Sequence, residues 1–453
     1  MSQTGPAPSL PAIPPTTGIT RGLILGAVVA LGAASYLLAP LVGPRGQAAL
    51  GVGCFILIVA ALSRNVHAVD WRAVGAGLAL QIGLALLILR FEVGGVRPVY
   101  ALFAVIAGMV GKFLEFTGAG SRFVFGALAD QELMGDVFPD GFVFAFTALP
   151  TIIFISAFFT TLYYFGILQF VVRIMARMMA SVMGTSGAET LAAVANVFMG
   201  HTEAPIIVKP YVPAMTQSEL LAMMAGGMAT ISGAVMAVYI SLGADPIAIL
   251  TTSVMAAPCG LYLSKLMLPE TDIPATRGRV TLIVERSHVN VIDAISSGAS
   301  DGLVLAMNVA AMLIVFLAFI AMFDYLLGAV SPGLSLSVVF AWLLSPVAFL
   351  MGVPPADVPA VADLLGTKLV ANEFVAFVKL STTYDGVLSE RARVLSTFAL
   401  TGFANFASVG MLLGGIGGLA PGRRPDLARL GMRALLVGFL ATIINASIAA
   451  VVM

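Results

Sequence analysis

Charged side chains are scarce in this chain: Asp, Glu, Lys and Arg make up 10% of its 453 residues, whereas soluble domains carry about 25%. Hydrophobic residues make up 59%. So few polar side chains cannot cover a water-exposed surface, which excludes a soluble globular protein and predicts an all-α polytopic membrane protein. The 23 basic and 23 acidic residues cancel, so the sequence gives no reason to expect a nucleic-acid partner.

Cysteine and histidine are also rare, and their positions exclude several kinds of site. The two cysteines, Cys54 and Cys259, make no disulfide framework and are expected to pack as small apolar residues. Of the three histidines, only His201 lies in an apolar region, and no HExxH motif or Cys–His spacing accompanies it. An intramembrane enzyme using His201 and Glu203 would lack a nucleophile or a metal set. The sequence therefore predicts a protein that is not an enzyme and has no cofactor.

Long apolar runs alternate with short polar connectors. Residues 1–20 are rich in Pro, Ser and Thr and nearly free of charge, which indicates a disordered tail rather than a signal peptide. After this tail, runs long enough to cross a bilayer of roughly 30 Å are predicted at 22–41, 47–63, 73–91, 219–243, 246–267, 301–329, 334–351, 392–419 and 434–453.

Four other segments carry too much charge for a plain span. Residues 98–130 mix apolar and charged positions, which predicts an amphipathic helix at the membrane interface. Residues 142–182 predict a spanning helix followed by a shorter interfacial or re-entrant one. The connector 268–300 is predicted to lie on the membrane surface. The arginine-rich segment 422–433 predicts a cytoplasmic loop, which places the C-terminus on the extracytoplasmic side.

One sequence frame occurs twice. The stretches 203–209 and 373–379 share the pattern Glu-x-x-x-Ile/Phe-Val-Lys, 170 residues apart. Flanking pairs agree in order: Met-Gly before each frame, Ser-Glu at the start of the next apolar helix, and Thr230 and Thr401 within those helices. Chance similarity is the alternative, because membrane sequences draw on few residue types. The ordered landmarks favour a duplication, which is typical of secondary transporters that bind solute at interrupted apolar segments.

Both interrupted segments, 184–210 and 352–380, contain Gly, Pro and charged side chains between apolar flanks. Neither fits lipid as a plain helix, because buried charge and broken backbone must be satisfied by protein or water. Surface loops are the alternative, but a solvated loop needs no apolar flanks. Two re-entrant helix–turn–helix hairpins, near 184–215 and 352–385, fit better, with polar tips that face a cavity near the membrane middle.

Glu203 and Glu373 are the main candidates for a binding role at the two tips. A carboxylate in a cavity accepts hydrogen bonds from a hydroxyl- or amide-bearing solute, or takes up a coupling proton. A structural ion pair is the alternative, but Lys209 and Lys379 lie six residues further on, which is the wrong side of a helix. His201 is expected to form hydrogen bonds, and a proton relay is the bolder alternative.

Two helices that follow the hairpins carry polar clusters. Within 392–419, Asn405 and Ser408 are three residues apart and are predicted to share one helix face, where they bind solute or join helices. Within 219–243, Gly, Thr and Ser residues surround Thr230. They either permit close helix packing or mark an unwound stretch whose carbonyl groups hold a cation, and the sequence leaves both interpretations open.

At these positions the chain resembles a known family, the concentrative nucleoside transporters. The stretch 200–211 (GHTEAPIIVKPY) resembles a family pattern that begins GQTEAP and ends in a basic residue, Pro and an aromatic residue. The stretches 365–377 (LGTKLVANEFVAF) and 402–410 (GFANFASVG) resemble two further family patterns, and 290–302 is similar to a fourth. The likeness extends from about residue 98 to the C-terminus.

The resemblance implies a fold and an assembly. About eight transmembrane helices, two re-entrant hairpins and interfacial helices would form the inverted repeats of an elevator-type transporter, assembled as a homotrimer in the cell membrane. The scaffold would contain 21–97 and the connector and helix of 268–351. The moving transport domain would contain the first repeat, 98–267, and the second repeat, 352–453.

The resemblance also implies roles for individual residues. The first hairpin tip would read the nucleobase through His201, Thr202 and Glu203. The ribose hydroxyls would be held by Glu373, Asn405 and Ser408, and the apolar side of the pocket would be lined by Phe403 and Val235. A sodium ion would bind oxygen atoms, which suit a hard cation, from Asn196, Met199, Thr230 and Ile231. His201 stands where the family usually has Gln, which leaves the base preference open and adds a group that titrates at about pH 6.5.

These observations predict a nucleoside importer driven by a cation gradient, with sodium favoured over protons. The alternative is an elevator transporter for another polar solute, such as a nucleobase or a modified nucleoside. The expected partners are the nucleoside, the lipid bilayer and two further copies of the chain.

Overall fold

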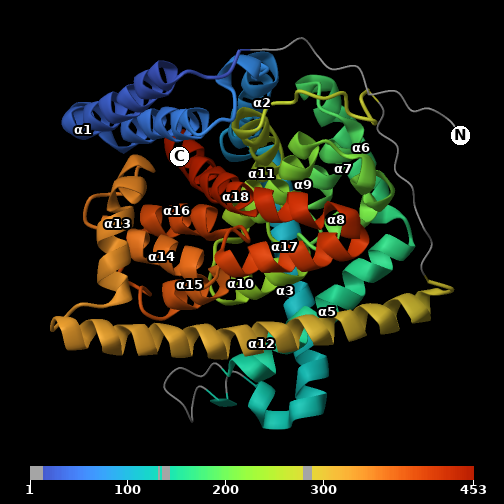
Figure 1. Ribbon diagram of the computed structural model, residues 1–453. Coiled ribbons are helices and arrows are strands. Elements are labelled where there is room, and N and C mark those ends of the chain that lie inside the picture. The colour runs from blue at the N-terminus through green and yellow to red at the C-terminus, as the bar shows by residue number, and fades with distance from the viewer. Residues whose placement is uncertain (1–13, 131–132, 135–142, 279–287) are drawn as a thin grey trace, which may run out of the picture.

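The computed structural model describes residues 14–130, 133–134, 143–278 and 288–453, and these residues form helices joined by turns and short irregular segments (Figure 1). Most of the predicted tail lies outside the described residues. The first helix begins at Gly18, two residues before the predicted end of that tail.

The N-terminal elements contain a long helix with a break in its middle. In α1, Gly43 has a φ of 65° and a ψ of −176°, which only glycine adopts readily, and Pro40 and Pro44 flank it. The predicted runs 22–41 and 47–63 are the two parts of this helix. The elements in order are α1 (Gly18–Ala61), η1 (Val66–Ala68), α2 (Trp71–Leu89), α3 (Pro98–Phe125), η2 (Gly126–Ala129), α5 (Phe144–Tyr164) and α6 (Ile167–Met183).

The rest of the chain runs twice through the same order of elements: a helical hairpin, a broken helix and a long helix. The first series is α7 (Gly187–Ala195), α8 (Ala204–Ile207), η3 (Lys209–Ala214), α9 (Gln217–Ala229), α10 (Gly233–Ser241) and α11 (Pro246–Met267). Between the two series lie α12 (Val291–Val330) and α13 (Leu336–Leu350). The second series is α14 (Val358–Val370), α15 (Glu373–Ser381), α16 (Glu390–Leu400), α17 (Phe406–Leu419), η4 (Pro421–Arg423) and α18 (Arg424–Val452). Below, hairpin 1 denotes 187–214 and hairpin 2 denotes 358–381.

The predicted runs 219–243 and 392–419 are both interrupted: the unwound stretch left open for 219–243 is present, and 392–419 is wrong as a continuous helix. The first is divided into α9 and α10, and the second into α16 and α17. The reason is local capping: Ser232 Oγ accepts a hydrogen bond from the Val235 amide at 3.4 Å, and Asn405 Oδ1 accepts one from the Ser408 amide at 2.8 Å. Such side chains satisfy the start of a new helix in place of the helix before it. Asn405 therefore begins a helix instead of sharing a helix face with Ser408.

Three other boundaries differ from the prediction. Residues 98–130 were predicted to form a helix that lies at the membrane interface. By length and composition, however, α3 is able to cross a membrane. The helix α12 begins at Val291, inside the predicted surface connector, and α18 begins at Arg424, inside the predicted loop 422–433. In both places the charged residues occupy the first turns of a long helix, where charge is tolerated at the polar edge of a membrane.

The number of spans agrees with the prediction of about eight. Seven helices in the described part of the chain are long and apolar enough to cross a membrane, and one of them, α1, contains two predicted runs. The chain is therefore a multi-pass membrane protein.

The helix α12 runs across the lower part of the molecule in Figure 1, and α1 lies at the upper left. Glycines on α12 allow α5 to approach closely. A Cβ atom on Gly298 would lie 2.7 Å from the Ala157 Cα atom, and one on Gly302 would lie 2.7 Å from the Ile153 Cα atom. Small residues four apart are a usual device for joining helices in membranes.

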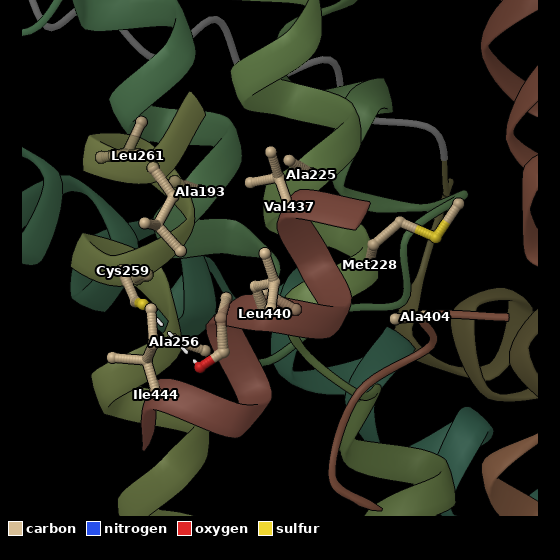
Figure 2. Packing of buried hydrophobic residues seen from close by; sticks show 14 of the residues in the cluster. Ala193, Ala225, Met228, Ala256, Cys259, Leu261, Ala404, Val437, Leu440 and Ile444 are labelled. Atoms are coloured by element: carbon tan, nitrogen blue, oxygen red, sulfur yellow. Dashed lines mark hydrogen bonds between the residues drawn. The ribbon is translucent and has the colours of Figure 1, made fainter. Parts of the chain in front are cut away.

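The two series pack against each other crosswise. The helix α9 of the first series lies on α18 of the second, and α11 also contacts α16 and α18. Figure 2 shows the resulting core, in which Val437, Leu440 and Ile444 of α18 meet small residues of the first series such as Ala225 and Ala256. Reciprocal contacts of this kind are typical of two units related by a two-fold axis.

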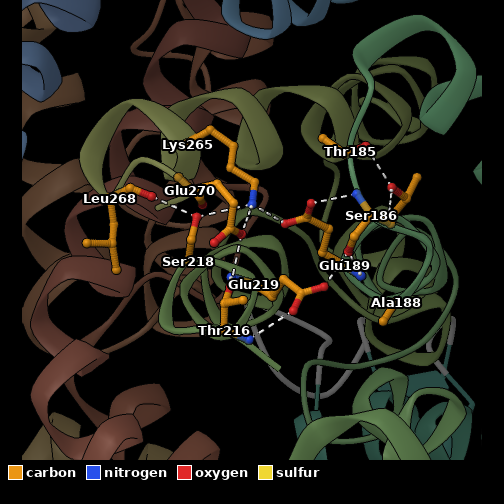
Figure 3. A network of polar contacts seen from close by, with 12 residues as sticks. Thr185, Ser186, Ala188, Glu189, Thr216, Ser218, Glu219, Lys265, Leu268 and Glu270 are labelled. Atoms are coloured by element: carbon orange, nitrogen blue, oxygen red, sulfur yellow. Dashed lines mark hydrogen bonds and ion pairs between the residues drawn. The ribbon is translucent and has the colours of Figure 1, made fainter. Parts of the chain in front are cut away.

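Polar side chains join the open end of each hairpin to the broken helix that follows it. In the first series, Ser186 Oγ donates to Glu219 Oε1 at 2.5 Å (Figure 3). The buried Lys265 ammonium lies 2.7 Å from Glu189 Oε2 and 3.0 Å from Glu270 Oε2. In the second series, the Ser389 hydroxyl donates to the Asp357 carboxylate at 2.6 Å. Each hairpin is therefore fixed at its base, while its tip points to the interior.

Candidate functional site

The tip of hairpin 1 begins where α7 ends. All nine residues of α7 are buried, and Asn196 is its C-cap. The Asn196 amide donates to the Ala192 carbonyl oxygen at 2.9 Å, which directs the side chain back along the helix. Further along the tip, the Gly200 amide donates to Glu203 Oε2 at 3.2 Å. The tip is thus held by its own short-range bonds.

The tip of hairpin 2 places a carboxylate among donors from two other elements. Asn372 caps α15 by accepting a hydrogen bond from the Val375 amide at 2.8 Å, and Glu373 follows it directly. Glu373 Oε1 accepts from the Tyr239 hydroxyl, and Glu373 Oε2 accepts from the Asn405 amide, each at 2.9 Å. Glu373 is 5% exposed, so the two bonds orient a carboxylate that is almost out of contact with solvent.

The breaks in the two broken helices meet each other. The amide of Phe403, in the second break, donates to the carbonyl oxygen of Thr230, in the first, at 3.1 Å. Thr230 and Ile231 are buried, and Val235 is buried in the first turn of α10. Two helix C-termini, which expose carbonyl groups, and two helix N-termini, which expose amides, therefore converge. The Gly/Thr/Ser cluster left open above marks an unwound stretch.

His201 lies in the interior beside this junction. Its ring is 4.6 Å from the ring of Phe403, centre to centre, at an angle of 60°. The residue is 6% exposed, and neither ring nitrogen has a hydrogen-bond partner among the described residues. A buried polar group without a partner is costly and rare in folded proteins. The His201 ring is therefore available to a ligand.

Other unpartnered polar atoms lie at the same junction. Asn196 Oδ1 and Ser408 Oγ are buried and also lack partners in the described part of the chain. Asn196 Oδ1 would be 3.4 Å from a Cβ atom on Gly227, which places it against the last turn of α9. A free amide oxygen beside an unwound helix end fits a hard cation such as sodium, which prefers neutral and charged oxygen ligands.

Glu203 and Thr202 face a different space. They line a cavity of about 520 Å³ together with Met199 and Ser232. The opposite wall comes from α5 and from Asp301 on α12. The lining does not include His201, Glu373 or Asn405. The predicted residues thus divide into an inner group at the junction of the broken helices and three residues, Met199, Thr202 and Glu203, on the face of hairpin 1 that meets α5 and α12.

Three residues in or near the site were not predicted to take part in it. Tyr239 donates to Glu373 and stacks on Phe377 with ring centres 4.3 Å apart, but in the sequence it is one aromatic in an apolar run. Asp301 stands at the start of a predicted span, and a lone acidic residue there signals no partner. Lys368 was recognisable as a charge in a broken apolar segment, but its partners lie 31 and 74 residues away.

Comparison with known proteins identifies the family. The family described as "Na+ dependent nucleoside transporter N-terminus" matches residues 50–128, and "Na+ dependent nucleoside transporter C-terminus" matches 248–450. Residues 145–246 match the family described as "Nucleoside recognition". Together these three matches extend over most of the chain.

Two curated relatives show how far the likeness extends. An uncharacterized transporter of Haemophilus influenzae is 41% identical over 410 residues, which cover 88% of this chain and 96% of that protein. Sodium/nucleoside cotransporter 1 of Mus musculus is 40% identical over 421 residues, which cover 88% of this chain. The matched part spans 63% of the mouse protein.

Solved structures agree with the sequence comparisons. The structure of CNTnw in an inward-facing substrate-bound state is 35% identical, with a TM-score of 0.83, and the match covers 90% of this chain and 97% of that one. A CNTnw variant in an outward-facing state is also 35% identical, with a TM-score of 0.85 and the same coverage. The chain therefore belongs to the concentrative nucleoside transporter family.

Proposed function

We propose that this chain imports nucleosides across the cell membrane and that a sodium gradient drives the import. The observation that carries this proposal is the set of buried, unpartnered polar atoms on Asn196, His201 and Ser408, because all three residues lie where the two hairpins meet the two broken helices. A solute and a cation would satisfy these atoms. The relatives named as sodium/nucleoside cotransporters support a nucleoside as the solute and sodium as the cation.

The chemistry of the inner group suits a nucleoside. Glu373 is fixed by Tyr239 and Asn405 and offers remaining lone pairs to the ribose hydroxyls, and Ser408 Oγ is a further partner. The His201 ring and the Phe403 ring offer a polar edge and an apolar face to the base, with Val235 beside them. Thr202 and Glu203 would complete the base contacts from the cavity side.

Sodium would bind at the end of α9. Its ligands would be oxygen atoms of Met199, Thr230 and Ile231 together with Asn196 Oδ1, which has no hydrogen-bond partner among the residues described. Solute and cation would then stabilise the same arrangement of hairpin 1 and the α9–α10 break. Binding of one would favour binding of the other, which is the linkage that lets a gradient drive uptake.

The two hairpins and broken helices would move together as a transport domain against a scaffold, in an elevator-type cycle. CNTnw has been solved in inward-facing, intermediate and outward-facing states, which supports such a cycle. We keep 21–97 and 268–351 in the scaffold and add α5 to it, because Gly298 and Gly302 join α5 to α12. The remaining parts of 98–267 and 352–453 form the transport domain. The assembly is a homotrimer, with the C-terminus on the extracytoplasmic side.

Proteoliposome uptake tests the proposal. The purified full chain should accumulate labelled uridine or adenosine under an inward sodium gradient and not under a proton gradient alone. Competition by nucleosides and by free bases separates a nucleoside importer from a transporter of another polar solute. The variants Glu203→Gln and Glu373→Gln should lose uptake while keeping the wild-type elution profile. Normal transport by both variants would show that the site is assigned wrongly.

A further inference from the structure

Hairpin 2 contains a lysine in the interior of the protein that has no part in the proposed solute site. Lys368 lies on α14, shortly before the tip, and is fully buried. Its Nζ atom is 2.7 Å from the Ala399 carbonyl oxygen and 2.9 Å from Thr442 Oγ1, and it lies 5.7 Å from the centre of the Phe439 ring. Every one of these neighbours attracts a cation.

The hydrogen-bond directions indicate that this lysine only donates. The Thr442 hydroxyl donates its proton to the Phe439 carbonyl oxygen at 2.9 Å, so Thr442 Oγ1 accepts from Lys368. The Ala399 carbonyl oxygen also accepts. Both hydrogen-bond partners of Lys368 are acceptors, and an aromatic ring lies on a third side. These surroundings suit a positively charged ammonium group.

The ammonium group of Lys368 lies at the end of a helix. The helix α16 stops at Leu400, so the Ala399 carbonyl is one of the last four in the helix, which have no partner within it. The carbonyl groups at a helix C-terminus carry a partial negative charge that stabilises cations. Lys368 therefore places its charge at the end of the broken helix of the second series.

The first series also places a polar side chain of its hairpin at the end of its broken helix, two positions earlier in the repeated frame. Asn196, at the end of the first arm of hairpin 1, lies against the last turn of α9. A Cβ atom on Gly226 would be 3.5 Å from its Nδ2 atom, and one on Gly227 would be 3.4 Å from its Oδ1 atom. The helix α9 stops at Ala229. Here the hairpin offers an unpartnered oxygen instead of a positive charge.

We infer that Lys368 is the resident cation of the second series and fills, with its ammonium group, the place that corresponds to the sodium site of the first. This inference rests on the proposed sodium-coupled transport. An exchangeable cation would then bind only beside Asn196, and one sodium ion would move with each nucleoside. The substitution Lys368→Asn, which repeats the side chain of the first series, would open a second sodium site at the end of α16.

The ratio of sodium to nucleoside measures this directly. Purified full-length protein in proteoliposomes is held at a set voltage, and the voltage at which labelled uridine flux reverses gives the number of sodium ions per uridine. We expect one for the wild-type protein and two for Lys368→Asn. The Hill coefficient for sodium should rise from about 1 to about 2, because coupled sites give coefficients up to the number of sites.

A second lysine in the same hairpin provides the matched control. Lys379 on α15 pairs with Asp363 at 2.6 Å, and its hydrogen bonds go to Ser337 and Thr367 and not to the end of α16. Lys379→Gln should keep a ratio of one sodium ion per uridine.

A wild-type ratio of two would overturn the inference without any variant, so the inference stays testable if Lys368→Asn does not fold. A ratio of one in an active Lys368→Asn or Lys368→Thr protein would also overturn it. Absence of sodium-driven uptake in the wild-type protein would contradict the proposed function instead.

Discussion

His201 is the residue at which a single substitution tests the proposed binding of the base. Neither ring nitrogen has a hydrogen-bond partner in the part of the chain that the structure describes, and the ring packs on Phe403. Removing the ring in His201→Ala takes away the proposed buried hydrogen bond, worth about 1–3 kcal/mol, so the KM for a preferred nucleoside should rise roughly 5- to 150-fold. His201→Gln should retain uptake and change the order in which nucleosides compete. Uptake of a labelled nucleoside against a panel of unlabelled ones measures both effects.

A histidine outside the site provides the control for this prediction. His67 lies in the short η1 turn between α1 and α2. His67→Gln should leave both the KM and the order of competition unchanged. If His201→Ala and His201→Gln also keep the wild-type KM and order, then the base does not contact this ring.

At the same scale, the sequence predicted most of the inner group and for a physical reason. Glu373 and Asn405 stood out because charge and amide groups are costly in an apolar segment, and the structure joins them by a hydrogen bond. Tyr239 and Lys368 escaped because their partners come from other elements. An aromatic ring in an apolar run reads as packing until the partner of its hydroxyl is known.

At the scale of elements, hairpin 1 packs on two adjacent glycines of α9 that differ sharply in the space available for a side chain. A Cβ atom on Gly227 would be 2.7 Å from the His201 Cβ atom, which forces the tip to move, whereas one on Gly226 would have nothing nearer than 3.5 Å. Gly227→Ala should therefore raise the sodium concentration for half-maximal uptake at least about 10-fold, the equivalent of 1.4 kcal/mol. Gly226→Ala should leave it within about two-fold. The sodium dependence of uridine uptake distinguishes the two, and equal behaviour of both variants would contradict the close contact.

The base of hairpin 1 depends on a charge balance instead. Lys265 is the only basic side chain that the described ion pairs place beside Glu189 and Glu270. Lys265→Met leaves two carboxylates close together, one of them buried, and should lower the free energy of unfolding by about 3–5 kcal/mol. Thermal unfolding of the detergent-solubilised protein measures this. Lys112→Met is the control, because Lys112 is 65% exposed and pairs only with Glu115 on the surface of α3; its unfolding temperature should not change.

The elements were predictable where apolar length alone decides them. The span 246–267 matches α11 at both ends, because a long apolar run with a capping Asp245 and a polar end has one interpretation. The break in 392–419 was not predicted, and the break in 219–243 was only one of two interpretations, because a long apolar run hides a cap such as Ser232 or Asn405. A capping side chain such as Ser232 is compatible with a continuous helix and with a broken one. Contacts from the other series stabilise the broken helix.

At the scale of the whole molecule, the close packing of α5 on α12 connects the first half of the chain to the long helix α12. A Cβ atom on Gly302 would meet the α5 backbone at 2.7 Å. Gly302→Ala should therefore push the helices apart, lower the unfolding temperature and reduce uptake. Gly328→Ala, on the same helix, should have no effect, because no atom of the described residues outside the neighbouring turns of the helix lies within 4 Å of a Cβ atom there. Unfolding temperature and uptake measured on both variants decide the matter, and a stable, active Gly302→Ala protein would contradict it.

The crosswise packing of the two series has a consequence for biosynthesis. Thr202 at the tip of hairpin 1 lies against Gly415 of α17, and Arg423 donates to the carbonyl oxygens of Pro213 and Met215. The ribosome makes these contacts available only after roughly 200 more residues, which takes on the order of 10–40 s at about 5–20 residues per second. During that interval hairpin 1 has only the neighbours that the first series supplies, such as Gly227 beside His201, and its polar tip lacks the contacts of the second series. We therefore expect hairpin 1 to reach its final position only after the last helices of the chain have been made.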